Sequence, residues 1–203
     1  MSFFIFTILK DENAHLVGDF LTKATELKLP CRVGVIDMRT KIFDATRKIL
    51  KKYSSKGIYF LTSKSKDEYN AFTAGLFHAK SELYLASAFV SLEMDLDELQ
   101  LATLLVRSQD TGACVPKTFL KEKGLGFEIV IPTQMDFGVV YCKQLTSDMT
   151  CLPGKVFAIS QNSIRQIEVN ANNLFSDHKL YRFFTANNIR FQLVDDCIFK
   201  ERN

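Results

Sequence analysis

The chain has 203 residues, of which 47% are hydrophobic and 24% charged, a composition typical of a globular protein with a substantial core. The formal net charge of +3 is too small to indicate nucleic-acid binding by itself, and the five cysteines include no Cys-x-x-Cys pair for structural zinc. Because the cysteines are dispersed along the chain and their total is odd, they favour a reducing, cytoplasmic setting. The apolar N-terminus lacks the features of a signal peptide and is interpreted as a first strand.

Strand and helix patterns alternate over the first two thirds of the chain. Apolar runs predict three strands, at residues 3–9, 32–37 and 58–61. Apolar residues three or four apart predict three helices, at residues 14–27, 42–53 and 65–78. The run at 81–90 fits either a strand or a helix, and an acidic stretch then leads into a predicted helix at 99–107. This alternation favours an α/β fold with a largely parallel sheet and helices on both faces.

The pattern changes in the last third. A helix is predicted at 116–123, ending at Gly124, and a clear strand at 127–132. Further elements are expected downstream: β-type runs at 138–142, 155–159 and 166–169, a helix at 174–187 and a strand at 189–194. We therefore expect additional antiparallel strands here. The predicted division is an α/β domain at 1–140 and a β-rich C-terminal extension with one helix at 141–203, packed on the same core.

Few residues have the spacing that catalysis or metal binding requires. Asp37 and Asp67 follow predicted strands, where sites form in open α/β sheets, so Asp37 could bind a metal or a ribose hydroxyl. Helix capping explains both acids as well. Asp95 and Asp97 could chelate Mg²⁺ or complement a helix start. The stretch 62–65, Thr-Ser-Lys-Ser, could accept a phosphate, although it lacks the glycines of a nucleotide-binding loop.

One short motif resembles a known catalytic pair. His78-Ala79-Lys80 is similar to the His-x-Lys of phospholipase-D-like enzymes, but the acid that should follow and the second copy are both missing. A surface helix end explains these residues better. The sequence therefore assigns no catalytic or metal-binding residue, and no cofactor is expected.

The strongest charge asymmetry lies between residues 39 and 66, where only Asp44 opposes a series of cations. The candidate partner-contact residues in this basic segment are Arg39, Lys41, Arg47, Lys48, Lys51 and Lys52. The segment could contact an acidic partner protein, an anionic surface or nucleic acid. A solvated face explains it equally well.

A family resemblance accompanies these patterns. The stretch 32–42, a strand that ends in an Asp before a basic, Thr-containing turn, resembles the opening strand of the SM family of syntaxin-binding proteins. The strand 58–61 with its following helix, and the runs at 83–86 and 127–132, fall where later strands of that domain are expected. The resemblance implies a cytosolic, non-enzymatic module that grips a helical partner. It carries over no individual binding residue.

The leading interpretation is a cytoplasmic, non-enzymatic protein-interaction module, an adaptor or assembly factor within a larger complex. The first alternative is an α/β enzyme or nucleotide-binding protein whose site lies at the carboxyl ends of the strands, with Asp37 and Thr62 near the phosphate or metal. The second alternative is nucleic-acid binding through the basic segment. The oligomeric state cannot be deduced from these residues.

Overall fold

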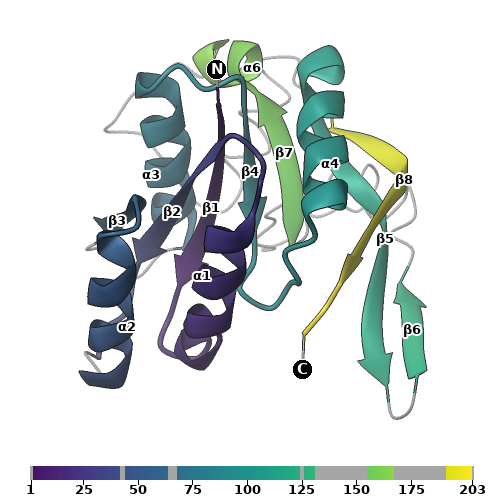
Figure 1. Ribbon diagram of the computed structural model, residues 1–203. Helices are drawn as coiled ribbons and strands as arrows, with labels where there is room; N and C mark the ends of the chain where they lie inside the picture. Colours follow the sequence, from purple (N-terminus) through teal and green to yellow (C-terminus); the bar gives the residue numbers. More distant parts are fainter. Residues whose placement is uncertain are drawn as a thin grey trace, which may run out of the picture.

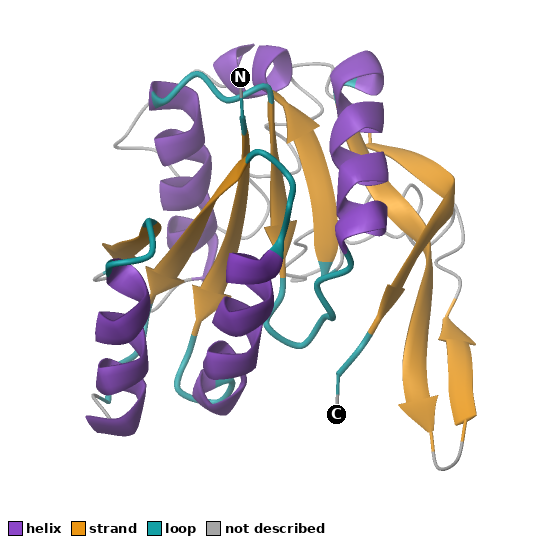
Figure 2. Cartoon of the chain, in the orientation of Figure 1, coloured by secondary structure: helices purple, strands orange, loops and turns teal. Residues whose placement is uncertain are grey.

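The computed structural model describes residues 2–41, 44–63, 68–123, 126–130, 155–166 and 191–202. These residues form one mixed sheet with helices against both of its faces (Figures 1 and 2). The predicted α/β class, with a largely parallel sheet and added antiparallel strands, is confirmed.

The strands are β1 (Phe3–Leu9), β2 (Cys31–Asp37), β3 (Ile58–Thr62), β4 (Ala86–Val90), β5 (Ala113–Lys123), β6 (Gly126–Val130), β7 (Val156–Ser160) and β8 (Phe191–Lys200). The helices are the 3₁₀ turn η1 (Ala14–Leu16), α1 (Val17–Glu26), α2 (Asp44–Ser54), α3 (Glu68–Ser81), α4 (Glu98–Thr111) and α6 (Gln161–Gln166). The ambiguous run at 81–90 thus contains a strand, and the helix expected at 99–107 is longer than predicted.

The strand order is β3-β2-β1-β4-β7-β5-β6, and β8 pairs in parallel with β5. The first four strands are all parallel, whereas β7 runs antiparallel to both β4 and β5. Leu9 is level with Asp37, and Asp37 with Thr62, so β1, β2 and β3 end side by side. The chain places β2 and β3 on one side of β1 and β4 on the other. The direction of winding therefore reverses beside β1.

One face of the sheet is covered by α1, α2 and α4. Helix α1 shows why: its buried residues Val17, Phe20, Leu21 and Ala24 recur every three or four positions and form a single apolar stripe. Leu101, Leu104 and Leu105 form the corresponding apolar stripe of α4. These helices and the strand residues facing them make one continuous core.

The opposite face is covered by α3 and α6 over an aromatic layer. Phe72 of α3 lies 5.6 Å from Phe6 of β1, 5.8 Å from Phe89 of β4 and 5.0 Å from Phe157 of β7, measured between ring centroids. Gly75 lets α3 approach closely, because a Cβ at that position would lie 2.5 Å from the Phe6 ring. This layer joins the parallel strands to the antiparallel ones.

The prediction of a helix at 116–123 is wrong, because these residues belong to strand β5. Backbone pairing with β6 and β8 outweighs local helix preference there. The ladder with β8 shifts register between Pro116 and Thr118, and an irregularity of this kind accommodates a proline, which cannot donate a ladder hydrogen bond.

The strands predicted at 155–159 and 189–194 are confirmed as β7 and β8, although β8 is parallel to its neighbour β5. The expected strand at 138–142, the helix at 174–187 and most of the strand at 166–169 lie outside the described residues. The two-part division of the chain stays a prediction. Across the part of the chain that is described, no helix has the length and apolar character needed to span a bilayer.

Candidate functional site

The candidate site lies at the edge of the sheet where β1, β2, β3 and β4 end. In the view of Figure 2 this is the lower edge, and the loops that follow these strands gather there together with the C-terminal segment. Ligands of open α/β sheets bind at this edge, beside the strand where the winding reverses. The loops after β1, β2 and β4 therefore supply the candidate groups of the site.

The loops after β1 and β2 are tied together by Asp11. Its carboxylate accepts hydrogen bonds from the Thr40 hydroxyl at 2.6 Å, the Thr40 backbone N–H at 3.2 Å and the Lys41 backbone N–H at 3.2 Å. The Thr40 hydroxyl is the main reason that the pKa of Asp11 lies below its usual value. Asn13 closes the β1 loop by accepting from the Lys10 N–H and donating to the Ile8 carbonyl.

Asp37, at the end of β2, holds Arg39 in a two-pronged pair. The Arg39 Nε donates to one Asp37 oxygen at 2.9 Å and Nη2 to the other at 2.7 Å. The Arg39 side chain is only 5% exposed, and its hydrogen bond to Asp37 raises its pKa. The remaining Nη1 group is buried and finds no acceptor among the described residues. Asp37 also accepts the Ser63 N–H through its backbone carbonyl, which links the ends of β2 and β3.

The loop after β4 meets the C-terminal segment through two ionic clusters. In the first, the Lys155 ammonium lies 2.6 Å from Glu93 and 2.6 Å from Glu201. Burial opposes the charge on Lys155, but the hydrogen bonds to Glu201 and Glu93 outweigh it and raise the pKa of the ammonium. Lys155 thus joins the β4 loop to the residues just after β8.

In the second cluster, Asp95 pairs with Lys23 of α1 and with Arg202, whose Nε lies 3.5 Å away. Backbone bonds hold the same contact: the Asp95 N–H donates to the Lys200 carbonyl, and the Arg202 N–H to the Glu93 carbonyl. Asp97, by contrast, caps α4 by accepting the Gln100 N–H at 3.1 Å. The structure therefore gives Asp95 and Asp97 separate roles.

The other residues singled out in the sequence fall in different places. Thr62 is exposed at the end of β3, whereas Lys64 and Asp67 lie outside the described residues. The His78 ring is 5.0 Å from both the Phe4 and Tyr59 rings, so it packs within an aromatic cluster. This packing gives His78 a structural role and does not support the catalytic interpretation of the His-x-Lys motif.

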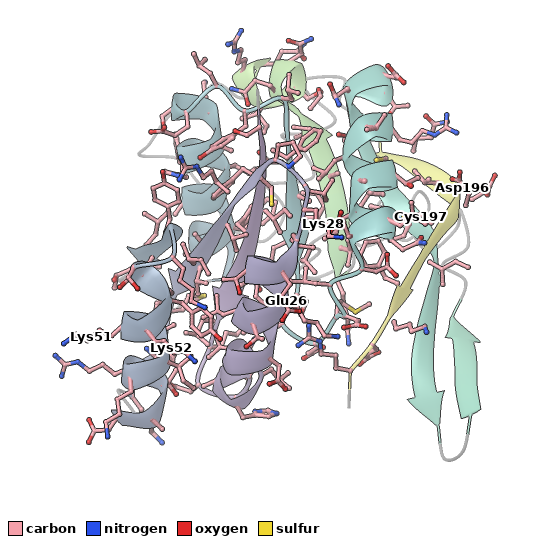
Figure 3. The ribbon with its side chains drawn as sticks, viewed as in Figure 1. Glu26, Lys28, Lys51, Lys52, Asp196 and Cys197 are labelled. Carbon is pink, nitrogen blue, oxygen red and sulfur yellow. The ribbon has the colours of Figure 1, made fainter. Side chains whose placement is uncertain are left out.

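The basic segment does not form one surface, because Arg39 is buried against Asp37. The remaining candidate partner-contact residues are exposed, in the loop before α2 or along the helix itself: Lys41, Arg47, Lys48, Lys51 and Lys52. Figure 3 shows Lys51 and Lys52 on the opposite flank of the molecule from Asp196 and Cys197 of β8. The candidate site at the ends of β1, β2, β3 and β4 lies between these two flanks.

Several solved structures share this fold at low sequence identity. PcManGT, a mannosyltransferase from Pyrobaculum calidifontis in complex with GDP-Man and Mn2+, is 15% identical, with a TM-score of 0.60 and coverage of 98% of this chain and 56% of that one. S. aureus TarS 1-349 in complex with UDP-GlcNAc is 14% identical, with a TM-score of 0.63 and coverage of 100% and 59%. This chain therefore spans little more than half the length of either.

A putative nucleotide-diphospho-sugar transferase from Desulfovibrio desulfuricans G20 is 10% identical, with a TM-score of 0.54 and coverage of 100% of this chain and 84% of that one. No family model matches the sequence, and no curated protein matches it. At these identities the likeness shows the fold.

The comparisons correct the resemblance to the SM family. Of the structures named above, two are described as a mannosyltransferase and a putative nucleotide-diphospho-sugar transferase, the third is in complex with UDP-GlcNAc, and none is a syntaxin-binding protein. The physical reason is that a strand ending in an acid before a polar turn occurs generally where parallel strands end. The pattern at 32–42 therefore indicates an open α/β sheet and does not distinguish one family from another.

The leading functional interpretation is contradicted as well. A non-enzymatic adaptor or complex subunit, with a protein as partner, does not agree with neighbours that bind GDP-Man and UDP-GlcNAc. The likeness favours the alternative interpretation, an enzyme or nucleotide binder with its site at the carboxyl ends of the strands. The nucleic-acid alternative gains no support from these neighbours.

Several of the described acids near the carboxyl ends of the strands are already engaged by cations of the chain itself. Across the described ranges, no group of three or more His, Cys, Asp and Glu side chains could hold a metal ion. Hard cations such as Mg²⁺ take several oxygen ligands, but Glu93 faces Lys155, and Asp95 faces Lys23 and Arg202. An ion would have to displace these side chains to reach the carboxylates.

Sequence reasoning missed Glu93, Lys155, Glu201 and Arg202 as site residues. Glu93 carried a signal, since it lies three residues after the end of β4, much as Asp37 ends β2. Lys155 and Glu201 carried none, because they are 62 and 108 residues from Glu93 in the sequence and meet it only through sheet pairing. No local pattern records such a contact.

Proposed function

We propose that this protein binds a nucleotide-diphospho-sugar at the carboxyl edge of β1 to β4 and transfers the sugar to an acceptor hydroxyl. The observation that carries the proposal is the pair of Asp37 with Arg39 at the end of β2, where a nearly buried guanidinium keeps its Nη1 amino group without an acceptor among the described residues. The fold shared with nucleotide-sugar transferases supports the same proposal.

The site residues offer complementary contacts to such a substrate. A carboxylate such as Asp37 accepts hydrogen bonds from ribose hydroxyls or from a base N–H, and a guanidinium such as Arg39 donates to phosphate oxygens. Thr62 adds an exposed hydroxyl at the end of the neighbouring strand. Asp11 holds the backbone of Thr40 and Lys41 in place beside them. These groups bind and orient the nucleotide.

In the proposed reaction, the bond between the anomeric carbon of the sugar and a phosphate oxygen breaks, and its electron pair leaves with the nucleoside diphosphate. The acceptor hydroxyl oxygen forms the new bond to the anomeric carbon, and its proton passes to a base or to water. Cations at the strand ends stabilise the charge that develops on the leaving diphosphate. The proposal includes a reducing, cytoplasmic setting, which agrees with the free thiols of Cys31, Cys114 and Cys197 among the described cysteines.

A thermal-shift titration with GDP-Man, UDP-GlcNAc and the corresponding nucleosides tests the binding step. A ligand at a hundredfold excess over its Kd stabilises the folded state by about 2.7 kcal/mol, which raises the melting temperature of a chain of this size by about 5–11 °C. We expect Asp37→Asn and Arg39→Met to lose most of that shift. Asp110→Asn, an exposed position near the end of α4, is the control.

Transfer is tested by release of the nucleoside diphosphate from whichever sugar nucleotide binds, in the presence of an acceptor sugar. Binding of the sugar nucleotide without release of the nucleoside diphosphate would support the nucleotide site and contradict the transfer step. Absence of any shift at millimolar nucleotide, with and without Mn²⁺, would remove the whole proposal.

A further inference from the structure

We propose that the diphosphate of the nucleotide is neutralised by protein cations, chiefly the Lys155 ammonium, and that binding needs no divalent metal ion. This inference rests on the proposed nucleotide site and concerns how that site handles charge. It departs from the PcManGT complex, which contains Mn2+ together with GDP-Man.

The first argument is the contact made by Glu93. Glu93 stands three residues after the end of β4, the strand next to β1 on the side where the winding reverses. An acid in this place could hold a metal against a diphosphate. Instead it faces Lys155 at 2.6 Å, and Lys155 also contacts Glu201 at 2.6 Å. The cation between these carboxylates therefore belongs to the chain itself.

The second argument is the local balance of charge. The carboxylates of Glu93, Glu201 and Asp95 face the cations of Lys155, Lys23 and Arg202. Each of these three carboxylates already faces a cation, and this weakens its attraction for Mg²⁺ or Mn²⁺, although Asp19 adds one more negative charge near Arg202. An incoming metal ion would have to repel Lys155 or Arg202, and the work of that displacement weakens its binding.

The third argument is that the cations retain donors for a phosphate. An ammonium has three N–H groups, and Lys155 is still 40% exposed while it contacts two carboxylates. Arg202 has two terminal nitrogens that are buried and meet no acceptor among the described residues. Burial lowers the pKa of Arg202, as expected where a guanidinium has only partial compensation. A bound phosphate would supply the missing acceptors.

The backbone holds these cations at the strand ends. The Lys155 carbonyl accepts the Ser91 N–H at 2.8 Å, which joins the start of β7 to the loop after β4. The Arg202 N–H donates to the Glu93 carbonyl at 2.6 Å. Both cations are therefore anchored to the loop that follows β4, and they need little rearrangement when an anion arrives.

The test is a calorimetric titration of the full chain with GDP and UDP, in EDTA and again with Mn²⁺. We expect the Kd in EDTA to lie within about threefold of the Kd with Mn²⁺, a difference of no more than about 0.65 kcal/mol. We expect Lys155→Met to weaken diphosphate binding about tenfold or more, with unchanged affinity for guanosine and uridine. Lys155→Arg, which keeps the charge, should retain most of the affinity, and Lys51→Met, an exposed change on α2, should alter nothing.

A direct metal titration gives a second readout. The electron paramagnetic resonance signal of free Mn²⁺ should persist in the presence of the native protein. It should fall in the presence of Lys155→Met, because this change leaves Glu93 and Glu201 without their shared cation. Thermal melting of each variant establishes that it is folded before either titration is read.

The outcomes separate the inference from the proposed function. Binding of GDP or UDP only when Mn²⁺ is present would overturn the inference and leave the nucleotide site standing, and so would tight Mn²⁺ binding to the native protein. No nucleotide binding in either buffer would overturn both. Equal binding in the two buffers that disappears in Lys155→Met would support both.

Discussion

The parallel strands β1 to β4 and the group of β5 to β8 contribute to the candidate site in different ways. We call the second group the antiparallel group because β6 and β7 run antiparallel to β5, although β8 runs parallel to it. In the parallel part, each functional residue lies at or just after the end of its strand: Asp37 is the last residue of β2, and Asp11 lies two residues after β1. In the antiparallel part, Lys155 and Glu201 come from distant stretches of chain that strand pairing brings together. The site is therefore local in sequence on one side and assembled by tertiary contacts on the other.

The largest expected effect tests whether the two parts unfold together. Phe6→Ala removes a fully buried ring of β1 and should cost about 3–5 kcal/mol in the free energy of unfolding. Phe199→Ala should cost a similar amount in β8, since this ring is also fully buried. Because Phe157 packs on Phe72 and Phe89 across the two parts, urea unfolding followed by circular dichroism should show one transition for each variant.

Leu99→Ala is the matched control, because this α4 side chain is 70% exposed and its truncation should cost less than about 0.5 kcal/mol. Two separate transitions in either core variant would break the comparison, since they would make the antiparallel group an independent unit.

A smaller effect is expected where the two parts are linked by charge. Asp95→Asn removes the shared counter-ion of Lys23 and Arg202, and should cost about 2 kcal/mol in the free energy of unfolding. Chemical denaturation measures this cost, with Asp196→Asn on the exposed side of β8 as the control. Equal stability of the two variants would mean that Asp95 contributes nothing to holding the C-terminal segment.

The third effect is confined to the start of α4. Asp97→Ala removes the carboxylate that accepts the Gln100 N–H and should cost about 1 kcal/mol. Asp110→Ala, at the other end of the same helix, should be neutral or slightly stabilising, because a negative charge near a helix C-terminus opposes the helix dipole. Thermal melting of the pair checks the sign. A loss of equal size at both positions would exclude capping as the reason for Asp97.

The smallest effect concerns Asp11 and depends on pH. Its pKa is lowered in the folded state, so its ionised form favours folding, and this contribution is fully present above the unfolded value near 3.8. This contribution is lost as the pH falls through the lower pKa that Asp11 has in the folded state. We expect Asp11→Asn to be slightly less stable than the native chain at pH 7 and equal to it in strong acid. A difference that persists at pH 2 would contradict this explanation.

Local patterns predicted the parallel part well, because its strands are short apolar runs and its helices have apolar residues three or four positions apart. Helix α1 shows this in Val17, Phe20 and Leu21. They failed for 116–123, where strands β6 and β8 supply the hydrogen bonds that make these residues extended. The same local patterns placed Arg39 among the candidate partner-contact residues, although its guanidinium is paired with Asp37, two residues away.

By itself, the sequence determined the α/β class and the position of Asp37 at a strand end, since periodicity and strand ends are properties of neighbouring residues. Only the tertiary structure decided that Glu93 meets Lys155 and Glu201, and that Asp95 meets Lys23 and Arg202. These contacts depend on the order of strands in the sheet, and that order is set by the packing of whole layers.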